Sequence, residues 1–230
     1  MNDKINNLYK KAREAKSAGK DEEAYNYFKE IKALDEESWE AKFEITYYEA
    51  ITSSVHGIWS ASVNVLNIEK LIFNAIHKYI PDEEKDEAVH DVFKGLTYIA
   101  EKFTKDSTHH FNSLRKVFKE DHVSEHVSSL SVAAEIMYLC GDSIIATFGE
   151  RYYDYAVSSW KTAIRINSSY VKFVSNKREH FKTIKKYTEK IHKYDKEYEA
   201  PAISRNEHSN KNVSEKIKMF IKNLNSKHHK

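Results

Sequence analysis

Proline and glycine are scarce in this chain, which has 2 prolines and 5 glycines among its 230 residues. A protein built from many short β-strands needs these residues at the turns that join the strands, so their scarcity argues against a sheet. Helices need far fewer of them. Because 40% of the residues are hydrophobic, the chain can also bury a core of one large or two small helical domains. We therefore predict an all-α fold.

The first 35 residues have the pattern of a helical hairpin. Apolar and small side chains recur at helical spacing on both sides of Gly19, which ends the first run. The small residues allow the two helices to approach closely, and Phe28 fills the space between them, as in tetratricopeptide repeats. Glu36 stands where that repeat usually has proline. The positions that match the repeat are Leu8, Ala12, Gly19, Ala24, Phe28, Ile31 and Leu34.

Further along, only the segment YAVSSWKTAIRI repeats this spacing, and no 34-residue period connects the two places. A regular solenoid needs about three adjacent repeats, so we predict an irregular helical array with a tetratricopeptide-like N-terminal hairpin. The expected parts are a body at 1–199 with its hairpin at 4–35, a linker at 200–212 and an amphipathic helix at 213–226. After the hairpin, the body helices are expected at 37–54, 58–80, 82–119 (either continuous or broken near Ser107), 123–148, 151–174 and 176–198.

Three segments resemble a known group of proteins. SWEAKFEITYY, YAVSSWKTAI and IHKYDKEYEAP are similar to an uncharacterised family of bacterial proteins with tetratricopeptide-like helices, over roughly residues 5–202. Members of that family often have a cysteine-rich zinc ribbon before the helices, whereas this chain has the single cysteine Cys140. The resemblance implies a helical fold and carries no activity over.

Composition indicates a cytoplasmic protein. A single cysteine excludes an internal disulfide framework, and the N-terminal MNDKINNLYKK lacks the apolar core of a secretory signal. Residues 51–68 contain no Asp, Glu, Lys or Arg, but their serine, threonine and asparagine content is too polar for hydrocarbon. We predict a buried helix-loop-helix there and no membrane span.

Local motifs of enzymes are missing from the sequence. It contains no GxSxG and no glycine-rich phosphate loop, and Cys140 lies in an apolar, helix-like stretch. Catalytic residues can also come together from distant positions, which a sequence does not reveal. We predict that the protein is not an enzyme and uses no cofactor.

Two kinds of motif in the sequence could bind a metal: Glu-x-x-His pairs and a pair of histidines one helical turn apart. Two Glu-x-x-His pairs, at 87–90 and 189–192, have the spacing of helical-bundle di-iron sites, but helical geometry places both glutamates on outer faces. His122 and His126 lie one helical turn apart, with Asp121 and Glu125 as their acidic neighbours. We interpret all of these as solvated residues and predict no metal site.

The first helix presents a candidate binding face. If its inner face works as tetratricopeptide grooves do, the partner-binding positions are Asn6, Tyr9, Arg13 and Lys16. An acidic peptide or a C-terminal carboxylate would suit their charge, and a merely solvated helix face is the simpler interpretation. The predicted function is therefore a non-enzymatic protein-protein interaction module or scaffold.

Charge supports an alternative function in the C-terminal third. Residues 1–160 carry 28 acidic and 19 basic side chains, whereas residues 161–230 carry 7 acidic and 18 basic ones. Lys182, Lys186 and Lys193 would share one face of a helix, opposite a tyrosine stripe. This face could bind nucleic acid or another anionic partner, although glutamates interrupt it and a solvated face is the simpler interpretation.

The last segment has the spacing of an amphipathic helix. It could pack on its own body, pair with a partner or a second copy of the chain, or lie on an anionic membrane, and we rank these in that order. We hypothesise that residues 200–230 control assembly. The apolar positions of this helix, which complete the set of predicted partner-binding residues, are Val213, Ile217, Phe220, Ile221 and Leu224.

Overall fold

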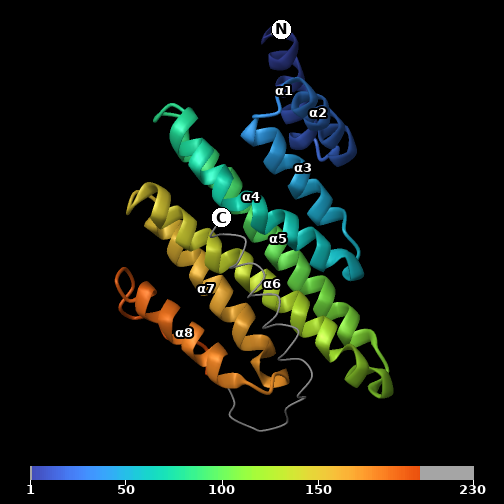
Figure 1. Cartoon of the computed structure of the whole chain (residues 1–230), viewed down its shortest axis with the longest axis vertical. Coiled ribbons are helices and arrows are strands. Elements are labelled where there is room, and N and C mark those ends of the chain that lie inside the picture. The colour runs from blue at the N-terminus through green and yellow to red at the C-terminus, as the bar shows by residue number, and fades with distance from the viewer. Residues whose placement is uncertain (1, 203–230) are drawn as a thin grey trace. The chain divides into compact units, whose positions relative to one another are not determined.

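The structure is a computed structural model that describes residues 2–202 (Figure 1). In these residues the chain forms eight α-helices, two short 3₁₀ helices and no strand, so the predicted all-α array is confirmed. The 3₁₀ helices are η1 (Val55–Gly57) and η2 (Val171–Phe173). The α-helices are α1 (Asn2–Ser17), α2 (Asp21–Leu34), α3 (Trp39–Thr52), α4 (Ile58–Tyr79), α5 (Lys85–Ser113), α6 (Lys116–Phe148), α7 (Tyr153–Tyr170) and α8 (Lys177–Ile191).

The chain divides into two compact units, of which unit 1 ends at Ile99 and unit 2 begins at Ala100. Unit 1 contains α1 to α4 and the N-terminal part of α5. Unit 2 contains the rest of α5 together with α6, α7 and α8.

Gly19 makes the turn of the N-terminal hairpin. Its φ of +69° lies in the left-handed region, where glycine carries no steric penalty. Gly19 N–H donates to the Lys16 carbonyl at 3.1 Å and Lys20 N–H to the Ala15 carbonyl at 2.9 Å, which is the Schellman arrangement. The helical hairpin expected at 4–35 is therefore present. The side chains that fill it are fully buried: Ala12, Ala24, Phe28 and Ile31.

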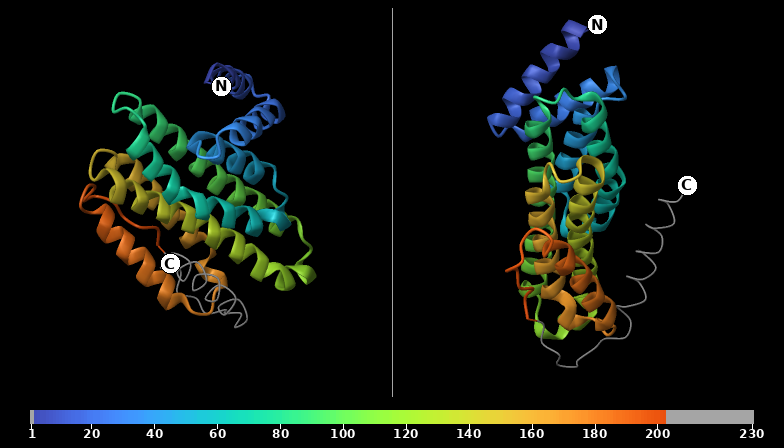
Figure 2. Two further views of the ribbon diagram at one scale, coloured as in Figure 1. Left: turned by 45° about the horizontal axis from the view of Figure 1, so that its top comes forward. Right: turned by 90° about the vertical axis from the view of Figure 1, so that its left-hand side faces the viewer.

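Ser38 and Pro81 mark element boundaries in unit 1. The Ser38 hydroxyl caps α3 by accepting the Ala41 N–H at 3.1 Å. Pro81 follows the end of α4 as predicted, because the residue before a proline disfavours helical backbone. The next helix begins at Lys85, three residues later than the predicted 82. Figure 2 shows the helices of this unit from two further sides.

The boundary between α5 and α6 differs from the one predicted from the sequence. We expected helices at 82–119 and 123–148, whereas α5 ends at Ser113 and α6 begins at Lys116. Arg115 has extended backbone angles, φ −62° and ψ 148°, and interrupts the helix without any glycine or proline. The alternative of a break near Ser107 is wrong, because Ser107 lies inside α5 and is buried. The break therefore has no local sequence signal.

Helix α6 packs against α7 through a close approach at Gly141. A Cβ atom at this position would stand 2.4 Å from Trp160 Nε1 and 2.8 Å from the Ala156 carbonyl oxygen, both on α7. By length and composition α6 could cross a membrane, and 56% of its most apolar 18-residue window is buried inside the protein. The core helix of a soluble protein meets the same criterion.

One carboxylate joins three helices of unit 2. Asp142 on α6 accepts hydrogen bonds from Trp160 Nε1 on α7 at 2.9 Å and from the Tyr187 hydroxyl on α8 at 3.0 Å. Lys190 Nζ, also on α8, lies 2.6 Å from the same carboxylate. Tyr187 in addition stacks on Tyr138 of α6, with ring centroids 4.1 Å apart. These bonds fix α8 against α6 and α7.

Candidate functional site

The binding face predicted on α1 is partly paired with α3, while Asn6 and Arg13 on it remain exposed to solvent. Tyr9 shares a hydrogen bond of 2.5 Å with the Ser38 hydroxyl. Arg13 forms a bidentate ion pair with Glu40, with nitrogen–oxygen distances of 3.0 and 2.7 Å. Asn6, the fourth predicted position, is exposed. The positive charge on which the acidic-peptide prediction relies is thus largely matched within unit 1.

Lys16, the last predicted position on α1, forms an ion pair with Glu44, a residue to which our sequence analysis assigned no role. Its Nζ lies 2.6 Å from Glu44 Oε1 on α3, and Glu44 is 4% exposed. Glu44 Oε2 is buried and accepts no hydrogen bond from the residues that the structure describes. Burial raises the pKa of the Glu44 carboxyl, and the neighbouring Lys16 offsets part of that rise.

Glu44 lies in the wall of a cavity of about 260 Å³ within unit 1, which we call the Glu44 pocket. It is somewhat smaller than the roughly 300–1,000 Å³ of pockets for drug-sized ligands, and its size suits a single side chain. Three helices contribute to its lining. The lining residues are Lys16 from α1, Phe43, Glu44 and Tyr47 from α3, and Asp91, Lys94, Gly95 and Tyr98 from α5.

Gly95 allows α5 to approach α3 at this pocket. A Cβ atom on Gly95 would lie 2.7 Å from Cζ of Phe43, which is closer than real Cβ contacts. The two helices therefore bring aromatic rings together, with the Tyr47 and Tyr98 centroids 6.1 Å apart. Tyr98 is 53% exposed and stands at the mouth. Burial is the main cause that raises the pKa of Tyr47 to about 12, so its hydroxyl is neutral at physiological pH.

The chemistry of the Glu44 pocket favours a ligand that is cationic and donates hydrogen bonds. Aromatic faces attract cations, and a buried carboxylate oxygen without a donor is stabilised when one arrives. The charges of Lys94 and Asp91 at the lining are of opposite sign and offset one another. From the sequence, Glu44 could have been indicated only by its place between Phe43 and Ile45 in a helix that is buried on most sides.

The basic face predicted on the last body helix is shorter than expected. We expected a helix at 176–198, but α8 ends at Ile191, so Lys193 lies beyond the helix and does not share its face. Lys182 pairs with Glu179 at 3.0 Å, and Lys186 lies over the Tyr187 ring at 5.0 Å from its centroid. These contacts join residues of the same helix, as is typical of a charged helix face exposed to solvent.

The structure places the residues of the candidate metal motifs in different environments. Glu87 and Glu189 are exposed, as helical geometry predicts. His126, which we expected to be solvated, is instead buried, so that expectation is wrong. Its ring stacks on Phe111 with centroids 4.5 Å apart and shares a hydrogen bond of 2.9 Å with Ser107, so it does not join His122. Burial lowers the pKa of His126 to about 4.

The predicted partner-binding residues at the C-terminal end lie outside the described residues. These are Val213, Ile217, Phe220, Ile221 and Leu224, and their role stays a prediction. No family model, curated protein or solved structure matches the chain. The site must therefore be interpreted from its own chemistry.

Proposed function

We propose that this protein is a non-enzymatic interaction module of tetratricopeptide-like type, which acts in the cytoplasm and binds a basic side chain of a partner protein in the Glu44 pocket. One observation carries the proposal. A carboxylate that is 4% exposed lines a pocket with aromatic walls, and its Oε2 accepts no hydrogen bond from the described residues.

The type of partner follows from the buried Glu44 Oε2, which accepts no hydrogen bond from the described residues, and from the aromatic walls of the pocket. A lysine or arginine side chain would place its aliphatic part between Phe43 and Tyr98 and its charged end near Glu44. Cation–π contacts contribute about 0.5–2 kcal/mol, depending on how far the cation is desolvated. An acidic side chain would instead meet an unmatched acceptor and the negative faces of the rings. The pocket therefore supports a basic partner over the acidic one expected from α1.

The α1–α2 hairpin supports the tetratricopeptide-like part of the proposal. Ala12, Ala24 and Phe28 are fully buried at positions where the repeat places small and aromatic residues. The face of α1 that lines the groove in such repeats contributes Lys16 to the pocket. The proposed binding site thus uses the predicted face of the hairpin, together with α3 and α5.

The test is a peptide array that contains matched triplets, identical except for Lys, Gln or Glu at the central position. We expect the full-length protein to retain the lysine peptides preferentially. Tyr98→Ala removes an exposed wall of the pocket and should weaken that retention about threefold to tenfold. Glu44→Gln keeps the shape of the side chain and should abolish the preference for lysine.

Glu49→Gln is the matched control, because Glu49 is an exposed glutamate on the same helix and does not line the Glu44 pocket. It should behave as the unmodified protein does. A preference for the glutamate peptides, or a lysine preference that survives both Glu44→Gln and Tyr98→Ala, would contradict the proposal. Far-UV circular dichroism of each variant checks that the helices are intact.

The alternative, binding of nucleic acid or another anion by the basic C-terminal third, stays a prediction. It requires retention on nucleic acid that falls steeply with salt, because phosphate binding releases counterions. Retention of a protein partner that nuclease does not change favours the interaction module.

A further inference from the structure

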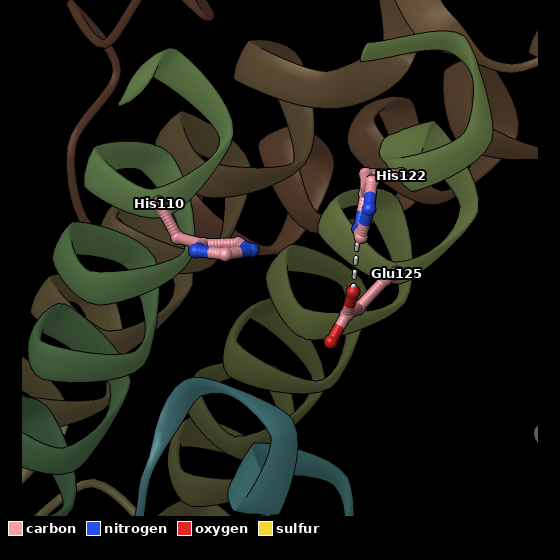
Figure 3. Close-up of side chains that lie close together, drawn as sticks. All are labelled: His110, His122 and Glu125. Atoms are coloured by element: carbon pink, nitrogen blue, oxygen red, sulfur yellow. Dashed lines mark hydrogen bonds and ion pairs between the residues drawn. The ribbon is translucent and has the colours of Figure 1, made fainter. Parts of the chain in front are cut away.

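Two histidines and a glutamate come together in unit 2, where α5 ends and α6 begins. His110 belongs to α5, and His122 and Glu125 belong to α6. Each of the three residues offers one ligand atom, and these atoms all lie within 4.8 Å of one another. Figure 3 shows His110 extending from its helix toward the other two side chains.

The arrangement on α6 follows from helical spacing. His122 and Glu125 are three residues apart and so share one face of the helix. His122 Nδ1 lies 3.1 Å from Glu125 Oε2, close enough for both to bind one ion. The ring of His110 approaches that of His122 edge to face, with centroids 5.9 Å apart.

The three residues are partly buried, which suits an ion that exchanges with solvent but is held by the protein. Nε2 of His110 is itself buried. The next histidine of α6, His126, points into the core and bonds to Ser107, so it is not part of the cluster. His109, adjacent to His110, is exposed, and its side chain projects from the helix in a different direction from that of His110.

We propose that His110, His122 and Glu125 bind a divalent transition-metal cation, specifically zinc. Two imidazole nitrogens and one carboxylate oxygen are ligands that zinc binds at about 2.0–2.2 Å. Magnesium and calcium prefer oxygen ligands throughout. In a tetrahedral zinc site the ligand atoms stand roughly 3.3 Å apart, so small side-chain rotations would close the observed separation.

Such an ion would link the end of α5 to the start of α6 across the break at Arg115. It would stabilise this boundary, for which the sequence contains no turn signal. Three protein ligands leave a fourth tetrahedral position for water or for a donor atom of a partner.

The experiment titrates the full-length protein with zinc chloride by isothermal titration calorimetry, after a chelator has removed bound metal. We expect one zinc ion to bind at this site and magnesium chloride to give no comparable binding. His122→Ala and Glu125→Gln should each weaken this binding at least tenfold, whereas His109→Ala, the exposed neighbour, should leave it unchanged. Cobalt(II) in place of zinc should give the visible absorption of a tetrahedral site, which His110→Ala should remove.

The proposal is overturned if the three cluster variants bind zinc with the affinity and stoichiometry of the unmodified protein. Binding would then belong to other histidines, such as His228 and His229 near the end of the chain. Comparable affinity for magnesium would also overturn it. Glu125→Gln keeps the size of the side chain, so it remains informative if an alanine variant fails to fold.

Discussion

At Gly141 of unit 2 there is no room for an added methyl group. Gly141 lies inside α6, where alanine would normally favour the helix by about 1 kcal/mol. The side chain of Trp160 and a backbone carbonyl of α7 occupy the space that a Cβ would need, at 2.4 and 2.8 Å. The close approach of the two helices depends on this glycine.

We expect Gly141→Ala to lower the free energy of unfolding by about 1–3 kcal/mol, because overpacking outweighs helix propensity. Urea denaturation followed by circular dichroism measures this change. Gly57→Ala serves as the control, since the nearest atoms to its Cβ would be at an ordinary 3.5 Å. A Gly141→Ala protein as stable as the original would mean that α7 moves aside without loss.

Glu135 makes the stability of unit 2 depend on pH. Glu135 is partly buried, and its desolvation, with a smaller contribution from Asp142, raises the pKa of its carboxyl from 4.5 to about 7. The folded state therefore binds this proton more tightly than the unfolded state, and its contribution to stability is lost as pH rises from 4.5 through 7. Each pKa unit corresponds to about 1.4 kcal/mol, so ionisation of Glu135 costs about 3 kcal/mol.

We expect Glu135→Gln to raise the free energy of unfolding at pH 8 by about 3 kcal/mol more than it does at pH 4. Denaturation curves across this range report the difference. Glu101→Gln, which alters an exposed pair with Arg165, should show little pH dependence of its effect. Equal effects of Glu135→Gln at both pH values would show that the native carboxyl titrates normally.

At the scale of elements, one carboxylate connects α8 to the rest of unit 2. Asp142 connects it to α6 through Tyr187 and Lys190, as described above, whereas the ion pair of Lys185 and Glu189 within α8 is exposed. Exposed pairs contribute about 0–1 kcal/mol, and a hydrogen-bonded carboxylate among buried aromatic rings contributes more.

We expect Asp142→Asn to cost about 1–3 kcal/mol and to loosen α8 before the rest of unit 2. Hydrogen exchange should accelerate in peptides of Lys177–Ile191 and change less in those of α7. Glu189→Gln should leave exchange in both helices as it was. If α7 and α8 accelerated equally in Asp142→Asn, the carboxylate would support the whole unit rather than the docking of one helix.

The predictability of the elements differs between the two ends of the described chain. Gly19 and Pro81 gave the correct places for the hairpin turn and for the end of α4, because their backbone preferences act locally. The break at Arg115 and the early end of α8 at Ile191 carry no such residue. Without a residue of strong local backbone preference, the sequence does not mark where these helices stop.

At the scale of the whole molecule, the hypothesis that residues 200–230 control assembly stays a prediction. We expect a chain that ends at Glu199 to differ from the full-length protein in solution mass or in free energy of unfolding. Light scattering and urea denaturation of the two chains measure these quantities. A shorter chain with the same mass and the same stability would refute the hypothesis.

The sequence by itself determined the helical class, the N-terminal hairpin and the outward direction of Glu87 and Glu189. These features follow from local backbone preference and from the spacing of apolar residues within one helix. Only the tertiary structure decided that Lys16 reaches Glu44 and that His110 approaches His122. Both pairs join different helices, and the crossing of two helices is set by side-chain packing that the spacing within either one does not encode.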